Sequence, residues 1–549
     1  MYESVRVSSS LVRDPPLAEP PSPPDASTLA QALVGGVIAL VAIASLWFFY
    51  SRGLTNLYGD AIAHMEGARR LTDSLTPGYQ EIGSVWLPLF HLLVAPLAVN
   101  DTLWRTGLGG SLVSMAAFAT TAWLLFRLGL EMNRNLAAGV VAAGGFVLAA
   151  NMLYVAVTPL TEPLTMLWAT STAYGLFRFY QSGRRTAFIG AAFAAFLGTL
   201  TRYDGWFLLP FAALFVMLAA KGDWMLRLRK AVIFSAIAGL GPLLWLLHNA
   251  HRFGNPLEFY DGPYSAQAIY AHQLATTGFR YPTDGGWLLS LRYYLEDMKL
   301  VIGVWPLELA LLGLVVWAVD GEGRSRRAAA LLLLVPLPFY VQAMANAAVP
   351  IYVPTLFPHT YYNLRYGLEM LPAVALFPSF LVGPRLTRPA RDAALILLLG
   401  AILLPCISSF SVGARELVTV KESLLNTPCK AETDRSLIDF FRERYDGGTI
   451  LLGLGKYPCV LPTLGIPYRH TLTEANRKYW RELPLGPDRW PPGSPLTSLH
   501  WILRGQGDPV DEVMRAYPSA FASFELVAQY AYPGEDRVQV YRLHSAQGK

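Results

Sequence analysis

The sequence is poor in charged residues and in cysteine. Only 15% of its 549 residues are Asp, Glu, Lys or Arg, against roughly 25% in an average soluble protein. Hydrophobic residues make up 53%, more than a soluble globule of this length can bury. The three cysteines, Cys406, Cys429 and Cys459, match no zinc-binding spacing. These shortages exclude a cytosolic enzyme, a wholly disordered chain and a secreted disulfide scaffold.

The charged residues that are present are spread unevenly. Residues 412–549 hold 33 of the 83 charged residues, and the much longer stretch 1–411 holds the other 50. The first stretch therefore has the composition of a membrane domain, and the second that of a water-soluble domain. The net charge of +5 is small and the basic residues lie in short loops, so we predict no binding to nucleic acid.

Apolar runs that approach the length of a bilayer span, about 20 residues, recur along the first part of the chain. We predict eleven membrane-spanning helices: 29–50, 106–126, 135–157, 163–180, 186–201, 206–220, 231–249, 301–319, 328–346, 366–382 and 392–411. The proline-rich tail 1–28 is expected to be disordered and cytoplasmic. A shorter run at 86–99 contains two prolines and suits an embedded segment better than a span.

The basic residues decide the orientation. If 86–99 does not span, 17 of the 27 Lys and Arg in residues 1–411 lie on the side of the N-terminus, which the positive-inside rule places in the cytoplasm. The loops 51–105 and 250–300 and the C-terminal segment 412–549 then lie outside the plasma or inner membrane. We predict an all-α polytopic membrane domain over 29–411, followed by a small extracytoplasmic α/β domain.

Periodicity within the C-terminal segment supports that domain. Helices are expected at 434–445 and 509–516, and strands at 449–453, 499–503 and 538–543. Cys429 and Cys459 could form a disulfide bond in an oxidising compartment; the alternative is two separate small apolar residues.

Ionisable residues near an apolar slab are functional candidates in a membrane protein. Here they gather on the outer side, a distribution that favours an enzyme fed from the bilayer over a transporter, which needs polar groups through the whole thickness. They are Asp60, His64, Glu66, Glu81, His91, Glu162, Arg202, Asp204, His248, His251, Glu308, His359, Arg365 and Glu369.

Two of the outer segments carry candidate carboxylates. Asp60 and His64 lie four residues apart just after the first span, hence on one face if the segment is helical; alternatively, Asp60 only caps that helix. Glu162 lies in the turn Thr-Pro-Leu-Thr-Glu-Pro, with an N-cap environment as the alternative.

Two others carry arginine beside aromatic residues. Arg202 and Asp204 lie in Leu-Thr-Arg-Tyr-Asp-Gly-Trp between two spans, where a solvated ion pair in an aromatic belt is the alternative. Arg365, in the stretch from His359 to Tyr366, suits a phosphate group, or it could merely pair with Glu369.

Taken in order, these motifs resemble the C-type integral-membrane glycosyltransferases. The resemblance covers roughly residues 30–410 and consists of a first outer loop opening with Asp, an embedded Trp-Leu-Pro-Leu-Phe-His segment, the Thr-Glu-Pro turn, the Leu-Thr-Arg-Tyr-Asp-Gly-Trp turn and a late Asn-Leu-Arg-Tyr. The pattern is similar to that of the protein O-mannosyltransferases and of the lipid A aminoarabinose transferase.

The resemblance implies a function and roles for residues. Such an enzyme would move a sugar from a polyprenyl-phosphate donor in the bilayer to an acceptor hydroxyl of the cell envelope, with inversion at the anomeric carbon. Asp60 would be the catalytic base, supported by His64 and Glu162, and Arg365 would contact the donor phosphate. The remaining candidates for binding donor or substrate are Arg202, Tyr203, Asp204, His359 and Tyr366.

Departures from the family pattern keep other functions open. No second acid adjoins Asp60 and no Asp-x-Asp occurs, so we predict no cofactor and no metal site like that of the oligosaccharyltransferase branch; a metal ion is possible but no clear motif supports it. The Trp-Trp-Asp-Tyr-Gly motif of the oligosaccharyltransferase branch is also absent. The alternatives are a flippase or transporter of polyprenol-linked glycans, and a non-catalytic membrane scaffold that binds envelope glycans.

Overall fold

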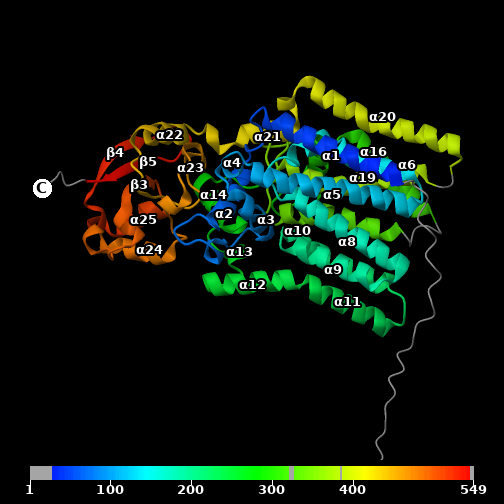
Figure 1. Cartoon of the computed structure of the whole chain (residues 1–549), viewed down its shortest axis with the longest axis horizontal. Helices are drawn as coiled ribbons and strands as arrows, with labels where there is room; N and C mark the ends of the chain where they lie inside the picture. The colour runs from blue at the N-terminus through cyan, green and yellow to red at the C-terminus, as the bar shows by residue number, and fades with distance from the viewer. Residues whose placement is uncertain (1–27, 321–326, 384–385, 545–549) are drawn as a thin grey trace, which may run out of the picture.

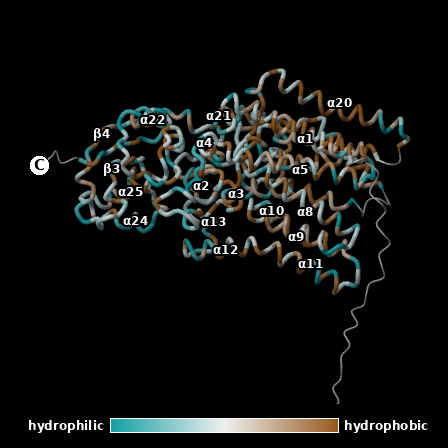
Figure 2. Tube along the Cα trace, viewed as in Figure 1, coloured by the Kyte–Doolittle hydropathy of each residue, from teal (hydrophilic) through white to brown (hydrophobic). Residues whose placement is uncertain are grey.

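The molecule is elongated, with a bundle of long helices at one end and a smaller domain with a β-sheet at the other (Figure 1). A computed structural model describes residues 28–320, 327–383 and 386–544. Most of the predicted N-terminal tail, residues 1–27, lies outside these ranges. The bundle is largely hydrophobic along its length, and the smaller domain is mixed (Figure 2).

Each of the eleven predicted spans coincides with a helical segment of the bundle. These segments are α1 (Thr28–Tyr50), α5 (Leu108–Asn133), α6 (Leu136–Val147) with α7 (Ala150–Val155), α8 (Glu162–Ser182), α9 (Arg185–Thr199), α10 (Tyr203–Ala219), α11 (Trp224–Ala238) with α12 (Leu240–Phe253), α16 (Val304–Val319), η2 (Ala328–Leu334) with α18 (Pro336–Ala345), η3 (Leu364–Met370) with α19 (Leu371–Leu376) and η4 (Phe377–Val382), and α20 (Arg388–Val412).

The helical segments differ in their capacity to cross a bilayer alone. Within the described residues, five helices are long and apolar enough: Thr28–Tyr50, Leu108–Asn133, Trp224–Phe253, Ala328–Ala345 and Arg388–Val412. A sixth arises if α15 (Trp287–Val301) and α16, which meet at an angle of 113°, count as one span. The other segments are shorter or interrupted, so the number of crossings stays a prediction.

Small residues let the helices of the bundle pack closely. A side chain at Gly129 of α5 would stand 2.5 Å from the carbonyl oxygen of Ala138 in α6, and one at Gly139 would stand 2.8 Å from that of Phe126. Glycine at such positions allows two backbones to approach, which is how membrane helices gain packing energy. The segment η3–α19–η4 contains Pro372 and Pro378, which cannot donate a backbone hydrogen bond and so break a regular helix.

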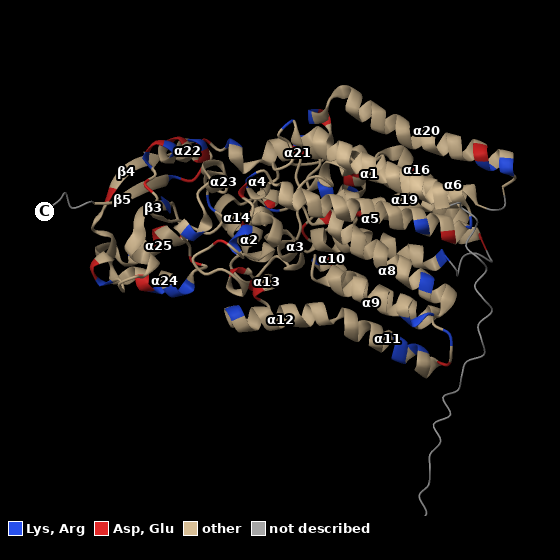
Figure 3. Cartoon of the chain, in the orientation of Figure 1, with Lys and Arg blue, Asp and Glu red and all other residues tan. Residues whose placement is uncertain are grey.

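The ends of the bundle differ in charge (Figure 3). Lys and Arg are coloured at the ends of α8 and α11 far from the smaller domain, the end that the predicted inner loops occupy. Arg324, Arg326 and Arg385 of those loops fall outside the described residues. Which end faces the cytoplasm stays a prediction.

The two long loops between the bundle and the smaller domain are themselves helical. The first contains α2 (Gly59–Arg70), η1 (Tyr79–Glu81), α3 (Leu89–Ala98) and α4 (Asp101–Arg105), and the second contains α13 (Glu258–Asp261), α14 (Ala266–Thr277) and α15. Because ten residues of helix are only about 15 Å long, α3 is too short to cross a bilayer. This agrees with the prediction that 86–99 is embedded rather than spanning.

The smaller domain contains a five-stranded mixed sheet in the order β2-β1-β3-β5-β4. Its strands are β1 (Thr449–Leu451), β2 (Thr471–Leu472), β3 (Leu499–Gly505), β4 (Phe524–Tyr530) and β5 (Val538–Leu543). Strand β1 pairs in parallel with both β2 and β3, with Ile450 opposite Thr471 and Trp501. Strand β5 is antiparallel to β3 and to β4. Sequence analysis found β1, β3 and β5 and missed β2, which is two residues long, and β4.

The helices of this domain cover the sheet and join it to the bundle. They are η5 (Ala414–Glu416), α21 (Val418–Asn426), η6 (Pro428–Lys430), α22 (Glu432–Arg444), α23 (Val460–Leu464), η7 (Tyr468–His470), α24 (Arg477–Glu482), η8 (Leu483–Leu485), η9 (Pro487–Arg489), η10 (Pro495–Ser498), α25 (Pro509–Ala516) and η11 (Pro518–Phe521). A disulfide bond joins Cys429 and Cys459, whose Cα atoms lie 5.4 Å apart. Of the two possibilities that the sequence left open, the bonded one is thus present, and the bond ties the segment after α21 to the loop after β1.

Candidate active site

Acidic residues at the beginnings of three helices converge where the bundle meets the smaller domain. Asp60 lies in the first turn of α2, Glu162 begins α8, and Asp204 lies in the first turn of α10. A helix N-terminus favours negative charge because its backbone N–H groups point outward and carry partial positive charge. Gly205 packs directly against the backbone of Gly198, which fixes the start of α10.

Arg365 of η3 lies at the centre of this region. Its Nε donates a hydrogen bond to Oε1 of Glu162 over 2.7 Å, and its Nη2 donates to a carboxylate oxygen of Asp60 and to the hydroxyl of Tyr366. The Arg365 side chain is 4% exposed, whereas that of Asp60 is 43% exposed. Of the two carboxylates bonded to Arg365, Asp60 is therefore the one that an incoming molecule can reach, since Glu162 is 1% exposed.

Arg202, just before α10, carries the second guanidinium of the region, and its side chain is 19% exposed. Its Nη1 lies 3.6 Å from Oε1 of Glu162, and its Nε lies 3.4 Å from Asp204 and 3.8 Å from Glu369. Its Nη2 donates to the hydroxyl of Tyr340 over 3.1 Å. Arg202 and Asp204 do form an ion pair. The alternative in which this pair is solvated is wrong, because Asp204 is buried.

Aromatic rings fix the two guanidinium groups. The ring of Tyr366 lies 4.8 Å from the guanidinium of Arg202 and 4.7 Å from that of Arg365, a distance at which cation–π attraction acts. Tyr366 stacks on Tyr340, which in turn stacks on Tyr294. The two positive groups are thus held at a fixed spacing.

The charge cluster consists of these two arginines and five carboxylates. We define it by its members: Asp60, Glu162, Arg202, Asp204, Arg365, Glu369 and Glu422. One oxygen each of Glu162 and Glu369 has no hydrogen-bond partner. Buried polar atoms are usually paired, so the cluster is not a saturated structural network.

Glu422 is the member that sequence analysis missed. It lies in α21, after the last predicted span, and is 1% exposed. Its Oε2 accepts from the hydroxyl of Tyr58 over 2.9 Å and its Oε1 from the backbone N–H of Leu364 over 3.1 Å, and it lies 4.0 Å from Nη1 of Arg365. Burial raises the pKa of Glu422, and nearby Arg365 opposes that rise. The only sequence signal was one acid in a short amphipathic helix.

The alternative interpretation of Arg365, in which it merely pairs with Glu369, is wrong. Arg365 bonds instead to Glu162 and Asp60, and Glu369 faces Arg202. The alternative role of Asp60, as the cap of its helix, is also wrong, because the N-cap of α2 is Tyr58.

His64 lies on α2 near the cluster but bonds elsewhere. Its Nδ1 and Nε2 of His91 are 2.9 Å apart, and its ring lies 4.4 Å from that of Trp86. Burial, aided by Arg202 and Arg365, lowers the pKa of His64 to about 3. His64 is therefore neutral at pH 7, and a role in orienting Asp60 or the sugar stays a prediction.

Two other predicted residues lie outside the cluster. The hydroxyl of Tyr203 donates to the carbonyl of Val85 over 2.6 Å, and its ring stacks on Phe259. His359 is exposed in a loop, where its Nδ1 lies 3.1 Å from the carbonyl oxygen of Pro354. Among the predicted residues, Asp60, Glu162, Arg202, Asp204, Arg365 and Tyr366 are the ones that the fold brings together.

No group of three or more His, Cys, Asp or Glu side chains suited to a metal ion occurs within the residues that the structure describes. The expectation that the chain has no metal site of the oligosaccharyltransferase kind stays a prediction.

The fold of the chain is similar to those of two solved structures, an ArnT and an oligosaccharyltransferase. ArnT from Cupriavidus metallidurans bound to undecaprenyl phosphate is 15% identical, with 95% of this chain and 99% of that chain covered and a TM-score of 0.49. The oligosaccharyltransferase of Archaeoglobus fulgidus in its apo form is 11% identical, with 95% and 75% covered and a TM-score of 0.49. No protein-family model and no curated protein matches the chain. Likeness of this extent assigns no activity.

Proposed function

We propose that the protein is an inverting glycosyltransferase that moves a sugar from a polyprenyl-phosphate donor to an acceptor hydroxyl. The observation that carries the proposal is a half-exposed carboxylate, Asp60, bonded to a buried guanidinium, Arg365, where three helix N-termini converge. Guanidinium groups and helix N-termini are both preferred sites for phosphate. The same place thus offers a base and an anion site.

The chain's own residues account for each step of the transfer. The acceptor oxygen attacks the anomeric carbon as the bond from that carbon to the phosphate oxygen breaks, and the hydroxyl proton passes to Asp60. Polyprenyl phosphate leaves with one additional negative charge. Arg365 and Arg202 stabilise that charge, and such fixed donors are most effective where water is excluded. Attack from the face opposite the leaving phosphate inverts the anomeric centre.

Binding of donor also prepares the base. Without donor, Nη2 of Arg365 is bonded to a carboxylate oxygen of Asp60, so that oxygen is engaged and not free for the acceptor. A donor phosphate competes for the same nitrogen. Its arrival frees Asp60, the exposed partner, while Glu162 keeps its bond to Nε. Asp60 is then available to the acceptor only when a donor is present.

The position of the charges supports an enzyme over a flippase. The charge cluster lies at the end of the bundle next to the smaller domain, and the opposite end carries separate ion pairs such as Arg127–Glu131. The helices between are almost free of charge (Figure 3). A polar path through the whole thickness, which a flippase needs for its charged cargo, has no counterpart among the described residues.

Asp60→Asn tests the proposal directly. The full chain in lipid nanodiscs would be assayed with synthetic polyprenyl-phosphate sugars, and the transferred sugar would be identified by mass spectrometry. Asn keeps the shape but cannot take the proton, so transfer should fall by about 10²–10⁴-fold. The matched control is Asp101→Asn, a carboxylate of the same loop that is 72% exposed. Wild-type transfer by folded Asp60→Asn protein would refute the assignment of the base.

A further inference from the structure

A group of basic residues lies where α12 meets the smaller domain. Figure 3 shows Lys and Arg at the end of α12 nearest that domain and on α24. We define the basic patch by its members, which are Arg252 of α12 and Arg477, Lys478 and Arg481 of α24. The two helices touch there, because Nη1 of Arg477 donates to the backbone carbonyl of Arg252. Positive charges from two distant parts of the sequence are therefore gathered on one surface.

Carboxylates do not neutralise the basic patch. Among the described residues, none of its four members forms an ion pair with Asp or Glu. Partial burial and the charges of Arg252 and Arg481 together lower the pKa of Arg477, and Glu258 opposes this effect only in part. Like charges so close repel each other, and an anion that binds between them relieves the repulsion.

Basic residues on another helix of the smaller domain behave differently. On α22, Arg435 pairs with Glu432 over 3.3 Å and Arg442 pairs with Asp439 over 2.6 Å. These pairs lie on the exposed surface of a helix, where each cation already has its counter-ion. The basic patch is thus a local excess of positive charge rather than a general property of the domain.

The exposed face of α12 places the basic patch at a membrane surface. Leu240, Leu243, Leu244 and Leu247 recur at helical spacing and are 47–56% exposed, as expected of a helix face in contact with lipid chains. Arg252 follows Leu247 by five residues, which is about 8 Å along a helix axis. The headgroup region of a leaflet is itself about 5–8 Å thick. Arg252 therefore lies at the level of the lipid headgroups.

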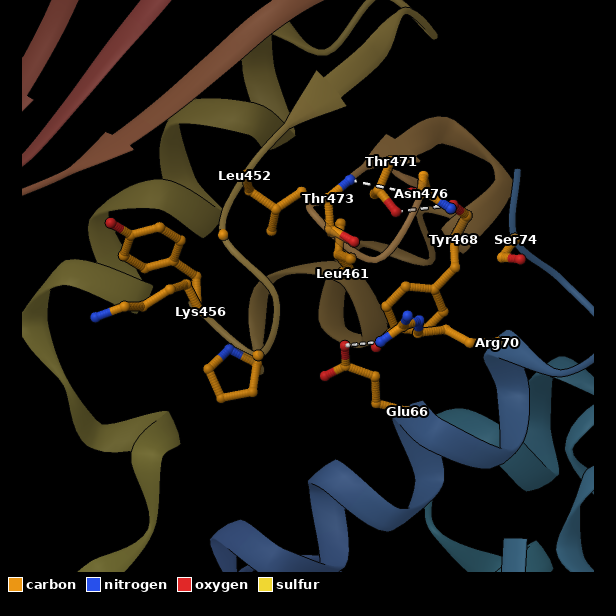
Figure 4. Close-up of a pocket in the computed structure, with 14 residues that line it drawn as sticks. Glu66, Arg70, Ser74, Leu452, Lys456, Leu461, Tyr468, Thr471, Thr473 and Asn476 are labelled. Carbon is orange, nitrogen blue, oxygen red and sulfur yellow. Dashed lines mark hydrogen bonds and ion pairs between the residues drawn. The ribbon is translucent and has the colours of Figure 1, made fainter. Parts of the chain in front are cut away.

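The first outer loop holds α12 and α24 at a fixed spacing. Nη2 of Arg252 donates to the backbone carbonyl of Gln80 over 2.6 Å. Asn476, which precedes α24, donates to the hydroxyl of Thr76 over 2.8 Å and lies across a narrow cleft from Arg70 of α2 (Figure 4). Because one loop bonds to both helices, the basic patch is formed before any ligand arrives. Such preorganisation lowers the cost of binding.

We propose that the basic patch binds the phosphate group of an anionic membrane lipid. A guanidinium group can bond two phosphate oxygens at once, and a lysine adds a point charge. The phosphates of lipids lie at the level of the headgroups, where α12 places the patch. Clusters of Lys and Arg beside the end of a membrane helix attract such headgroups. This contact would hold the smaller domain against the bilayer.

The test measures lipid binding to the full chain in detergent micelles by native mass spectrometry. The probes are dioleoyl phosphatidic acid and dioleoylglycerol, which has the same chains without the phosphate. The wild type should bind the first and not the second. Each charge removed should raise the dissociation constant about fivefold. Lys478→Gln with Arg481→Gln should therefore raise it about 25-fold.

The control variant removes the same number of charges elsewhere in the smaller domain. Lys478 and Arg481 are exposed, so their replacement should leave the fold intact. Arg435→Gln with Arg442→Gln changes the paired residues of α22 and should leave the dissociation constant of phosphatidic acid unchanged. Equal losses in the two double variants would show attraction to net charge alone and would overturn the proposal.

Competition distinguishes the two sources of a phosphate group. Inorganic phosphate in large excess should leave phosphatidic acid bound, because a lipid also gains from its chains along α12. Displacement by inorganic phosphate would identify a site for the free anion and overturn the lipid assignment. Equal binding of phosphatidic acid and dioleoylglycerol would show that the phosphate plays no part, and it would overturn the proposal as well.

Discussion

The two ends of the helix bundle hold ion clusters of opposite character. At the end far from the smaller domain, Glu131 accepts hydrogen bonds from Arg127, Tyr174 and Arg178 at 2.6–3.0 Å. There, one carboxylate meets two guanidinium groups, both partly exposed at 29% and 38%. At the other end, the charge cluster holds two guanidinium groups among five carboxylates, with Arg365 only 4% and Arg202 19% exposed.

The difference separates a structural cluster from a functional one. The oxygens of Glu131 are all bonded, so it has nothing left to offer a ligand. The charge cluster has carboxylate oxygens without partners and one carboxylate, Asp60, open to solvent. Unpaired buried groups lower stability, and such arrangements are found where binding or catalysis compensates for the loss.

Arg365 provides the largest expected contrast between the two ends. Arg365→Ala should lower donor use by about 10²–10³-fold, because a fixed donor to the leaving phosphate is removed. Donor use by Arg365→Lys should lie between that of the wild type and that of Arg365→Ala, because an ammonium group cannot replace the planar, two-pronged set of donors of a guanidinium. Initial rates over a range of donor concentrations would measure both.

Arg178→Ala at the opposite end is the matched control and should leave turnover of the folded protein unchanged. Equal losses for Arg178→Ala and Arg365→Ala would abolish the distinction between the two clusters.

The disulfide bond lies in the smaller domain, and its removal should destabilise that domain. The bonded cysteines are 30 residues apart, and opening a loop of that size lowers the free energy of unfolding by about 3 kcal/mol in the chain-entropy model. Cys429→Ser with Cys459→Ser should therefore reduce hydrogen-exchange protection of α22 and β1 in the full chain. Cys406→Ala, which changes the free cysteine of α20, should not. Unchanged protection in the double variant would show that noncovalent packing already holds the domain.

Glu422 tests whether the smaller domain contributes to the cluster through α21. Glu422→Gln keeps only one of the two acceptor oxygens that bond Tyr58 and Leu364 and removes the negative charge near Arg365, so we expect a loss of about tenfold in kcat. The lower limb of the pH–rate profile should also move, because a neighbouring carboxylate with a raised pKa is removed. Glu416→Gln, on an exposed neighbour, is the control. A wild-type pH profile for Glu422→Gln would leave Glu422 with a structural role only.

Asp434 of α22 offers the smallest effect, a pH dependence confined to the smaller domain. Burial raises the pKa of Asp434 to about 6, above its value in the unfolded chain, so the folded state binds the proton more tightly. Stability is therefore greater at low pH and is lost as pH rises, by about 1 kcal/mol between pH 5 and pH 6. Asp434→Asn, which keeps an acceptor for the backbone N–H of Cys459, should remove this dependence in hydrogen exchange. An unchanged pH dependence in that variant would assign it to another group.

The sequence by itself determined the membrane domain, its helical segments and the separate C-terminal domain. Long apolar runs have few stable solutions other than helices in a membrane. The short buried stretch 449–453 and the stretches 499–503 and 538–543 identified three of the five strands. It also placed Asp60, Glu162, Arg202 and Arg365 on one side, because charged residues avoid the apolar interior.

Only the tertiary structure decided which of these residues meet. Hydropathy carries no information on side-chain direction. Tyr203 and His359 were therefore site candidates on the same grounds as Arg365, but their side chains make their contacts outside the charge cluster. The sequence did not indicate Glu422 as a member of the cluster, because it comes from α21, 57 residues after Arg365. Glu66, which forms one ion pair with Arg70, and Glu81, which accepts several hydrogen bonds, likewise differ only in their neighbours. Partners distant in sequence are set by the packing of whole elements, and the chemistry of a buried charge depends on those partners.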